Sequence, residues 1–188
     1  MSINYKMQDH LEAVVELKSI IDPIFIDKII PFINHKAKKY LSVSGGLHKN
    51  IRNVKGYHLT NETPTNQFYW NFVKKEIERL YSFYKVKFPQ MESSKINQID
   101  LLKYKAGGKY DVHTDHGTNC PRHLSIIMNL NDKYEGGDLI FTNQKEKEIK
   151  RIKLNKGSIV FFPSNFMYPH SIQPITKGIR YSIVAWLQ

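Results

Sequence analysis

Cysteine is almost absent from the chain, since Cys120 is the only one among its 188 residues. A single cysteine cannot form an internal disulfide, and it excludes a zinc cluster built from several cysteines. We therefore expect a fold that is stabilised by its apolar core and does not depend on oxidising conditions.

Long apolar runs are also absent. The sequence contains no stretch of about 18 consecutive apolar residues, the length that a membrane-spanning helix requires. Its N-terminus lacks the apolar segment and the small-residue cleavage site of a secretory signal. The sequence therefore predicts a cytoplasmic protein with no membrane partner.

Repeats, low-complexity tracts and linkers rich in Pro, Gly and Ser are missing too. A boundary between two domains would normally fall in such a linker. Because 188 residues is also close to the usual size of one domain, we expect a single domain over residues 1–188. Nothing in the sequence indicates its oligomeric state.

Positive charge is abundant, with a formal net charge of +11. Such a charge attracts anionic partners such as nucleic acid or acidic protein surfaces. The basic residues are mostly lysines scattered among Asn and Ile, however, which favours an ordinary solvated surface. One local cluster, Lys145 to Lys153, alternates with Glu146 and Glu148 and predicts a solvent-facing hairpin. Nucleic acid is therefore a possible partner, but not the favoured one.

Helical signals occur in the first half. Thr63 followed by Pro64 is a favourable N-cap and first-turn pair. It precedes apolar residues at the three-to-four-residue spacing of one helix face: Phe68, Phe72, Val73, Ile77, Leu80 and Tyr84. An earlier helix is expected to begin near Asp22-Pro23 and to kink or break at Pro31. Residues 13–21 fit a strand or a helix equally well.

From about Ile99 the pattern changes to short segments rich in Ile, Val, Phe and Tyr, separated by turn residues. The predicted strands are 99–105, 110–115, 123–131, 137–142, 147–154, 157–162, 168–175 and 179–187. The predicted turns include Gly136-Gly137 and Lys177-Gly178. We therefore predict an α+β protein whose residues 99–188 form a jelly roll, that is, a double-stranded β-helix. Residues 1–98 would supply loops and helices packed on one outer face.

Three residues in the second half form a candidate metal site. His113 and Asp115 are two positions apart, so in an extended strand their side chains project to the same face. His170, near a later predicted strand, can complete the set. Two histidines and one carboxylate leave coordination positions open, which is the facial arrangement of non-haem Fe(II) oxygenases. His116 is an alternative ligand, ranked lower because its odd spacing from His113 breaks the shared face.

A basic residue for an anionic co-substrate follows this set. A 2-oxo acid can chelate iron through its carboxylate and keto oxygens, and the distal carboxylate of 2-oxoglutarate then needs a cation. Arg180, ten residues after His170, has a planar fork that binds carboxylates with two hydrogen bonds. Lys177 is a weaker rival because it lies in a predicted turn. The remaining histidines are interpreted as ordinary surface or loop residues: His10, His35, His48, His58 and His123.

Several motifs in order resemble prolyl-4-hydroxylase-type 2-oxoglutarate oxygenases. The first is Tyr104-Lys-Ala-Gly-Gly-Lys-Tyr110-Asp-Val-His113-Thr-Asp115. The others are residues 122–131, 134–141 and 156–163, followed by His170 and Arg180. The resemblance covers residues 99 to 188, about half of the chain.

This resemblance implies an enzyme that uses Fe(II), 2-oxoglutarate and O2. It implies that His113, Asp115 and His170 bind the iron and that Arg180 holds the distal carboxylate of 2-oxoglutarate. Tyr104 would donate its hydroxyl to the co-substrate, and Tyr110 would line the pocket.

Two further residues bear on the co-substrate site. Ser182 is on the same strand face as Arg180 and could add a hydroxyl. The chain departs from some relatives at Asn129, where they place a second tyrosine near the co-substrate.

The resemblance also implies the reaction, which is hydroxylation of an aliphatic C–H bond. The leading substrate is a prolyl residue in a peptide or protein, and the alternative is a free amino acid or small metabolite. A nucleic-acid oxygenase is disfavoured, because the dealkylating branch of the superfamily has an arginine where this chain has Trp186, which we expect in the core. A barrel that only binds ligands is the non-enzymatic alternative. Residues 42–60 and 116–121 are predicted loops that could close over a substrate.

Overall fold

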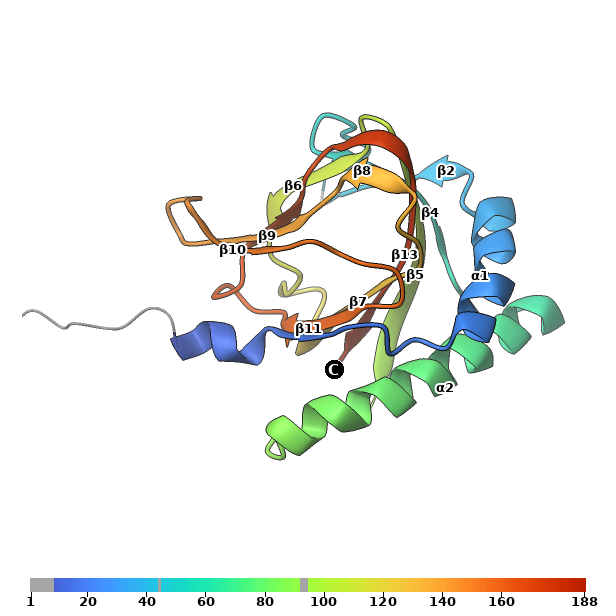
Figure 1. The fold of residues 1–188 in the computed structure, drawn as a ribbon, viewed down its shortest axis with the longest axis horizontal. Helices are drawn as coiled ribbons and strands as arrows, with labels where there is room; N and C mark the ends of the chain where they lie inside the picture. The colour runs from blue at the N-terminus through green and yellow to red at the C-terminus, as the bar shows by residue number, and fades with distance from the viewer. Residues whose placement is uncertain (1–8, 44, 92–94) are drawn as a thin grey trace, which may run out of the picture.

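The computed structural model describes residues 9–43, 45–91 and 95–188 (Figure 1). The helical elements are η1 (Asp9–Ala13), a 3-10 helix, and the α-helices α1 (Pro23–Lys36) and α2 (Pro64–Lys87). The strands of the first half and of its junction with the second are β1 (Val15–Leu17), β2 (Lys39–Tyr40), β3 (Arg52–Asn53), β4 (Lys55–His58) and β5 (Ile96–Lys105). Those that follow are β6 (Lys109–His113), β7 (Leu124–Asn129), β8 (Tyr134–Gly136), β9 (Leu139–Thr142), β10 (Glu148–Ile152), β11 (Ile159–Pro163), β12 (His170–Ile172) and β13 (Ile175–Leu187).

The strands form two antiparallel sheets that face each other. The larger sheet has eight strands, with β1, β11, β7, β13, β5, β4 and β2 in spatial order and β8 joined to β13. The smaller sheet has five, in the order β10, β9, β12, β6 and β3. This is the predicted double-stranded β-helix, and it encloses one cluster of buried side chains between the sheets.

The helices cover the outer face of the larger sheet, as predicted (Figure 1). Alternation along β5 explains the two cores: Leu101 packs under the helices, whereas its neighbour Leu102 points between the sheets. On α2 the predicted apolar face is buried from Val73 onward. Phe68 was predicted on that face but is exposed, because it lies before the buried stretch of α2 and its ring contacts other aromatic rings of the same helix, such as Phe72.

Both helices begin where the sequence predicts. The Thr63 side chain accepts a hydrogen bond from the backbone N–H of Asn66 at 3.2 Å, and the Asp22 side chain caps α1 in the same way. Pro31 does not interrupt α1, which runs continuously to Lys36, so of the two predicted effects, a kink or a break, the break is wrong. Within the described residues, neither helix combines the length and the apolar character needed to cross a membrane.

The first half of the chain contributes strands to the barrel, in addition to the predicted helices and loops. Strands β1, β2 and β4 extend the larger sheet, and β3 pairs with β6 in the smaller one. Six residues of the predicted loop 42–60 are therefore strand, and Ser44 lies outside the described residues. These strands are two to four residues long. Such short segments have no readable alternation of their own and form because a partner strand is present.

The predicted turn at Lys177-Gly178 is also wrong. Strand β13 continues through both residues and pairs with β8, a strand that the sequence did not predict. Gly178 has a φ of +80°, and a Cβ there would lie 2.5 Å from the carbonyl oxygen of Lys133. This glycine therefore permits a close approach between strands, at an irregularity in the ladder, and does not end a strand.

Candidate metal centre

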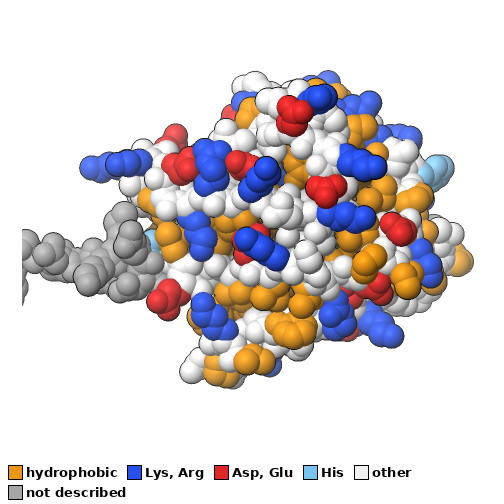
Figure 2. Space-filling model, viewed as in Figure 1, with side chains coloured by type: hydrophobic (Ala, Val, Ile, Leu, Met, Phe, Trp, Pro, Cys, Tyr) orange, Lys and Arg blue, Asp and Glu red, His pale blue; other side chains and the backbone are white. Residues whose placement is uncertain are grey.

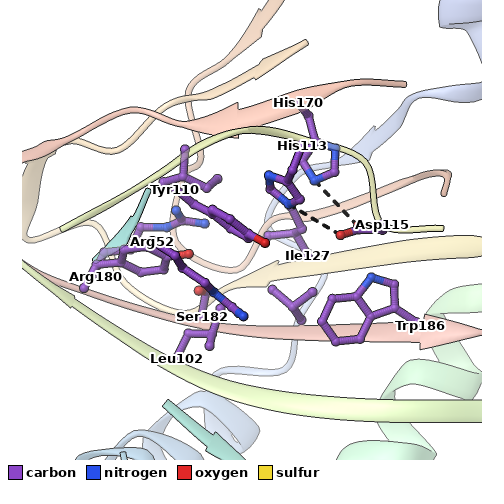
Figure 3. Close-up of a pocket in the computed structure, with 13 residues that line it drawn as sticks. Arg52, Leu102, Tyr110, His113, Asp115, Ile127, His170, Arg180, Ser182 and Trp186 are labelled. Atoms are coloured by element: carbon purple, nitrogen blue, oxygen red, sulfur yellow. Dashed lines mark ion pairs between the residues drawn. The ribbon is translucent and has the colours of Figure 1, made fainter. Parts of the chain in front are cut away.

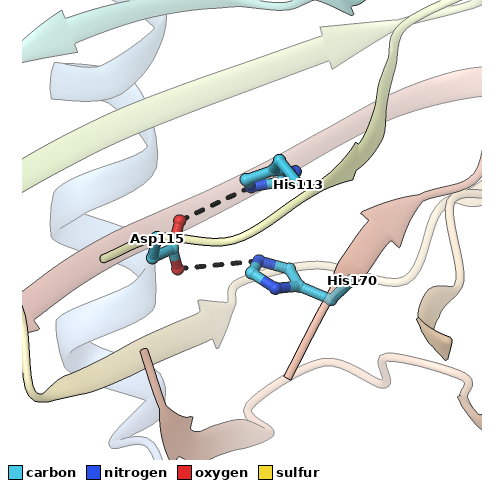
Figure 4. Close-up of side chains that lie close together, drawn as sticks. All are labelled: His113, Asp115 and His170. Atoms are coloured by element: carbon cyan, nitrogen blue, oxygen red, sulfur yellow. Dashed lines mark ion pairs between the residues drawn. The ribbon is translucent and has the colours of Figure 1, made fainter. Parts of the chain in front are cut away.

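The structure brings His113, Asp115 and His170 together (Figure 4). His113 is the last residue of β6 and lies directly opposite His170, the first residue of β12, in the antiparallel ladder. Asp115 follows β6, so its carboxylate reaches the same point. One potential ligand atom from each side chain lies within 4.8 Å of the other two. Strand pairing, a contact between segments 57 positions apart in the chain, thus completes the predicted set.

Backbone carbonyls orient both imidazoles. The Nδ1 of His113 lies 2.8 Å from the carbonyl oxygen of Asp111, and the Nδ1 of His170 lies 3.0 Å from that of Tyr168. Because a carbonyl oxygen only accepts hydrogen bonds, each Nδ1 must carry the proton. In the neutral ring Nε2 then has no proton, and its lone pair is free to bind a metal ion. The two Nε2 atoms face the Asp115 carboxylate at 3.5 and 3.6 Å.

The Asp115 carboxylate is buried but remains ionised. Burial alone would raise its pKa, but the adjacent His170 and His113 and a hydrogen bond from Ser125 outweigh burial and hold the pKa well below its usual range. Ser125 Oγ donates to Oδ2 of Asp115 at 2.6 Å. Burial lowers the pKa of His170 to about 4, so this imidazole is neutral at pH 7.

The Asp115 carboxylate and the two imidazole nitrogens together form a site that suits a cation. A carboxylate and imidazole lone pairs converge, and all are electron-pair donors, so they repel one another unless a positive ion lies between them. Neutral imidazole and carboxylate are ligands for first-row transition metals, and three ligands from one side leave positions open for small molecules. The residues present therefore fit a divalent metal ion such as Fe(II).

The hydrogen bond from Ser125 gives a prediction about metal affinity. Ser125→Ala should weaken Fe(II) binding about 10- to 100-fold, the usual effect of removing a group that orients a metal ligand. Anaerobic metal titration measures this directly. Ser164→Ala is the matched control, because Ser164 Oγ contacts Ser125 Oγ at 2.8 Å and, in the part of the chain that the structure describes, makes no hydrogen bond to Asp115. Equal affinities of Ser125→Ala and wild type would show that the carboxylate needs no such support.

A pocket between the two sheets opens from the triad (Figure 3). Tyr110 stacks on the His113 ring, with centroids 3.6 Å apart and planes at 19°. Apolar side chains from both sheets form much of the wall, including Leu102, Ile127, Ile172 and Val184. The pocket therefore combines an apolar interior with polar groups at two ends, as small-molecule sites usually do.

Arg180 lies at the other end of the pocket from the triad (Figure 3). It is only 1% exposed, its Nε donates to Oδ1 of Asn129 at 3.0 Å, and its guanidinium faces the Tyr104 ring. Among the described residues no carboxylate forms an ion pair with it. A buried, unpaired cation is costly, so this end of the pocket suits an anion. The rival Lys177 is exposed and pairs with Glu135 at 3.3 Å.

Hydroxyl groups lie beside this cation. Ser182, two positions along β13, has a fully buried Oγ with no hydrogen-bond partner in the described part of the chain. Tyr104 is also buried, and burial raises its pKa, so its hydroxyl keeps its proton. Asn129, the departure from some relatives, orients Arg180 through its amide oxygen and also accepts a hydrogen bond from Tyr134. In this chain an amide thus supports the arginine.

Sequence reasoning missed two pocket residues that carry polar groups, Trp186 and Arg52. Trp186, predicted in the core, is buried but lines the pocket, and its Nε1 has no partner among the described residues. It shares a strand face with Arg180 and Ser182, so the alternation along β13 was a usable signal. Arg52 comes from β3 and lies over the Tyr110 ring at 4.7 Å. Nothing in the sequence indicated this position.

The other histidines lie apart from the triad. His116, the alternative ligand, turns toward the carbonyl oxygen of Arg122 at 2.9 Å and does not belong to the cluster found among the described residues. His58 was interpreted as an ordinary surface residue, but its Nδ1 lies 2.7 Å from the buried Asp100 carboxylate. This hydrogen bond raises the pKa of His58.

Comparison with known sequences supports the interpretation of the second half of the chain. Residues 99–188 match the family model of the 2OG-Fe(II) oxygenase superfamily, which confirms the resemblance predicted for that stretch. A PKHD-type hydroxylase of a Synechococcus species is 29% identical over 101 residues, covering 50% of this chain and 43% of that protein. One of Pseudomonas fluorescens is 33% identical over 95 residues, covering 45% of this chain and 40% of that protein. The chain thus spans less than half the length of these relatives.

Solved structures support the fold along nearly the whole chain. A prolyl hydroxylase from Trichoplax adhaerens, in complex with a peptide fragment of the hypoxia-inducible factor oxygen degradation domain, superposes with a TM-score of 0.77 at 15% identity. The match covers 96% of this chain and 85% of that one. A Pseudomonas putida prolyl-4-hydroxylase gives a TM-score of 0.73 at 15% identity, with 97% of both chains covered.

Proposed function

Residues 99–188 are a 2OG-Fe(II) oxygenase region, and from this premise we propose that the protein is an Fe(II)- and 2-oxoglutarate-dependent dioxygenase. In this proposal His113, Asp115 and His170 bind Fe(II), and Arg180 binds the distal carboxylate of 2-oxoglutarate. The observation that carries it is the pairing of two sites in one pocket: a buried set of metal ligands at one end and a buried, unpaired arginine at the other.

Bound iron, with 2-oxoglutarate and O2, would supply the oxidising chemistry that hydroxylates a C–H bond. The protein's part is to position the reactants. Arg180 fixes one end of the co-substrate through its planar fork, and Asn129 keeps that fork from turning. Ser182 and Tyr104 each have a hydroxyl that can donate to a carboxylate oxygen.

The pocket walls would also control water and orientation. The apolar side chains between the two ends keep the interior dry, which strengthens the interactions of Arg180 and Asp115 with charged ligands. Tyr110 covers one face of the His113 ring, and burial raises the pKa of Tyr110, so it remains neutral there. A substrate group must therefore approach the metal from the side that these walls leave open.

For the substrate, we propose a prolyl residue in a peptide or protein. The relatives described above are named PKHD-type hydroxylases, and the two solved structures described above are prolyl hydroxylases, one of them in complex with a peptide. A free amino acid or small metabolite is the alternative substrate. A single domain over residues 1–188 and a cytoplasmic location remain predictions.

Substrate-stimulated succinate formation tests the proposed function. Purified protein, reconstituted with Fe(II), is incubated with 2-oxoglutarate and with proline-containing peptides, free amino acids or oligonucleotides. We expect proline-containing peptides to stimulate succinate release, and matched peptides with alanine in place of proline to give none. Stimulation by free amino acids alone would replace the prolyl proposal with the metabolite alternative. No turnover under any condition would contradict the enzymatic proposal.

A further inference from the structure

Two stretches of the sequence contain basic residues and no acidic ones. Residues 28–61 contain seven Lys and Arg but neither Asp nor Glu, and residues 101–110 contain three lysines between Asp100 and Asp111. The chain as a whole has 17 acidic residues, so long gaps of this kind are unusual within it. The lysines of both stretches are therefore not interleaved with carboxylates along the sequence.

The fold places these stretches side by side. Lys55 of β4 is directly opposite Lys103 of β5, and Lys105 is two residues further on the same face of β5. Tyr40 of β2 is opposite Lys55 on the other side. We call the resulting surface the lysine face, and it consists of Lys38, Lys49, Lys55, Lys103 and Lys105. Figure 2 shows basic side chains along the rim where Figure 1 places β2.

The lysine face is not neutralised by the protein itself. In the parts of the chain that the structure describes, no carboxylate pairs with any of its five lysines, whereas lysines elsewhere do have acidic partners, as Lys109 has in Asp111. Burial lowers the pKa of Lys103, and the charges of Lys105, Lys38 and Lys55 lower it further.

This arrangement is costly in the isolated protein. Like charges directly opposite each other on neighbouring strands are destabilising. Lys55, Lys103 and Lys105 nevertheless border one hollow of about 130 Å³ together with Tyr40 and Asn53. An anionic partner seated over this hollow would relieve the repulsion among the lysines.

We propose that the lysine face binds the phosphate backbone of double-helical nucleic acid. Lysine is depleted at protein–protein interfaces, where aromatic residues and arginine are enriched, so a lysine-only surface does not fit a protein partner. Lysine binds phosphate as a point charge, and a duplex carries a negative charge about every 1.7 Å along its axis. The sequence pI of about 9.6 agrees with such a partner.

The aromatic residue beside the lysine face, Tyr40, favours a duplex over a single strand. Proteins that bind single strands without sequence preference stack the bases on exposed aromatic rings. Here Tyr40 already has the ammonium groups of Lys49 and Lys55 over its ring, at 4.0 and 5.2 Å from the centroid. The ring is thus engaged by lysines, and the surface offers charge rather than a stacking platform.

The lysine face is separate from the metal centre. Along β5, Tyr104 points into the pocket, whereas its neighbours Lys103 and Lys105 point to the opposite face of the sheet. Duplex binding is therefore independent of the proposed oxygenase activity, and either can fail without the other.

Fluorescence anisotropy with a labelled 20-base-pair DNA duplex tests the proposal across a range of salt concentrations. The double variant Lys103→Gln/Lys105→Gln should weaken binding and reduce the slope of log K against log salt by about 2, since each lost phosphate contact contributes about 0.9. Lys145→Gln/Lys147→Gln removes the same charge from the exposed β9–β10 hairpin and should leave the slope unchanged.

Competing anions decide what the lysine face recognises. A 20-nucleotide oligo-dT and a decaglutamate peptide are titrated in parallel, and we expect both to bind more weakly than the duplex. Stronger binding of either one, or equal salt slopes for the two double variants, would overturn the proposal. Thermal unfolding serves as the folding control. Both lysines of the first variant are repelled by their neighbours, so we expect its Tm to be no lower than that of the wild type.

Discussion

Asp115→Ala should reduce succinate formation by on the order of a hundredfold or more, because the loss of a direct ligand must exceed the 10- to 100-fold effect of losing a group that only supports one. The carboxylate is the single anionic member of the triad, and it lies between two imidazole nitrogens at 3.5 and 3.6 Å. Without it, two neutral donors remain to hold a divalent cation. His113→Ala should have an effect of the same size, for the same reason.

A neighbouring residue provides the control for this prediction. Asp111→Asn removes a carboxylate that pairs with Lys109 at the surface and keeps the backbone carbonyl that orients His113. Its succinate formation should stay close to that of the wild type. Wild-type turnover by Asp115→Ala or His113→Ala, measured in the same assay, would refute the assignment of the metal ligands.

Arg180→Gln should raise the KM for 2-oxoglutarate roughly 30-fold to several thousandfold. Truncating one partner of a buried, hydrogen-bonded charge pair costs about 2–5 kcal/mol, and about 1.4 kcal/mol corresponds to a factor of ten. Arg180 is 1% exposed and lies in the pocket without a carboxylate partner among the described residues, so a bound dicarboxylate would form such a pair.

A co-substrate analogue without the distal carboxylate distinguishes a direct role of Arg180 from a structural one. 2-Oxovalerate has the same chain length as 2-oxoglutarate but lacks the distal carboxylate. The wild type should strongly prefer 2-oxoglutarate, and Arg180→Gln should lose most of that preference. Lys177→Gln, at the rejected rival position, should keep wild-type kinetics. An unchanged preference in Arg180→Gln would show that another group holds the carboxylate.

Much of the barrel and of the site could be predicted because it depends on local alternation. In a strand, residues two positions apart share a face, so His113 with Asp115 and Arg180 with Ser182 could each be grouped from the sequence. The order of the family motifs then linked these two pairs to each other and to His170 in one predicted site. Nothing local specifies that His170 pairs with His113, because the register between distant strands is set by the packing of the whole sheet.

The missed features depend on contacts rather than on local pattern. Arg52 belongs to a strand of two residues, which forms only because β6 offers a partner edge. The glycine at position 178 was interpreted as a turn, whereas the close approach of Lys133 requires it inside a continuous strand. Composition alone suggested a solvated, scattered distribution of lysines, and only the pairing of β4 with β5 brings Lys55 beside Lys103.

The iron content of the anaerobically prepared protein tests the metal assignment most directly. Wild-type protein incubated with Fe(II) and then desalted should retain about one iron per chain, whereas Asp115→Ala treated in the same way should retain almost none. Wild-type protein that keeps no iron, or a variant that keeps as much as the wild type, would contradict the proposal that this triad is a metal centre.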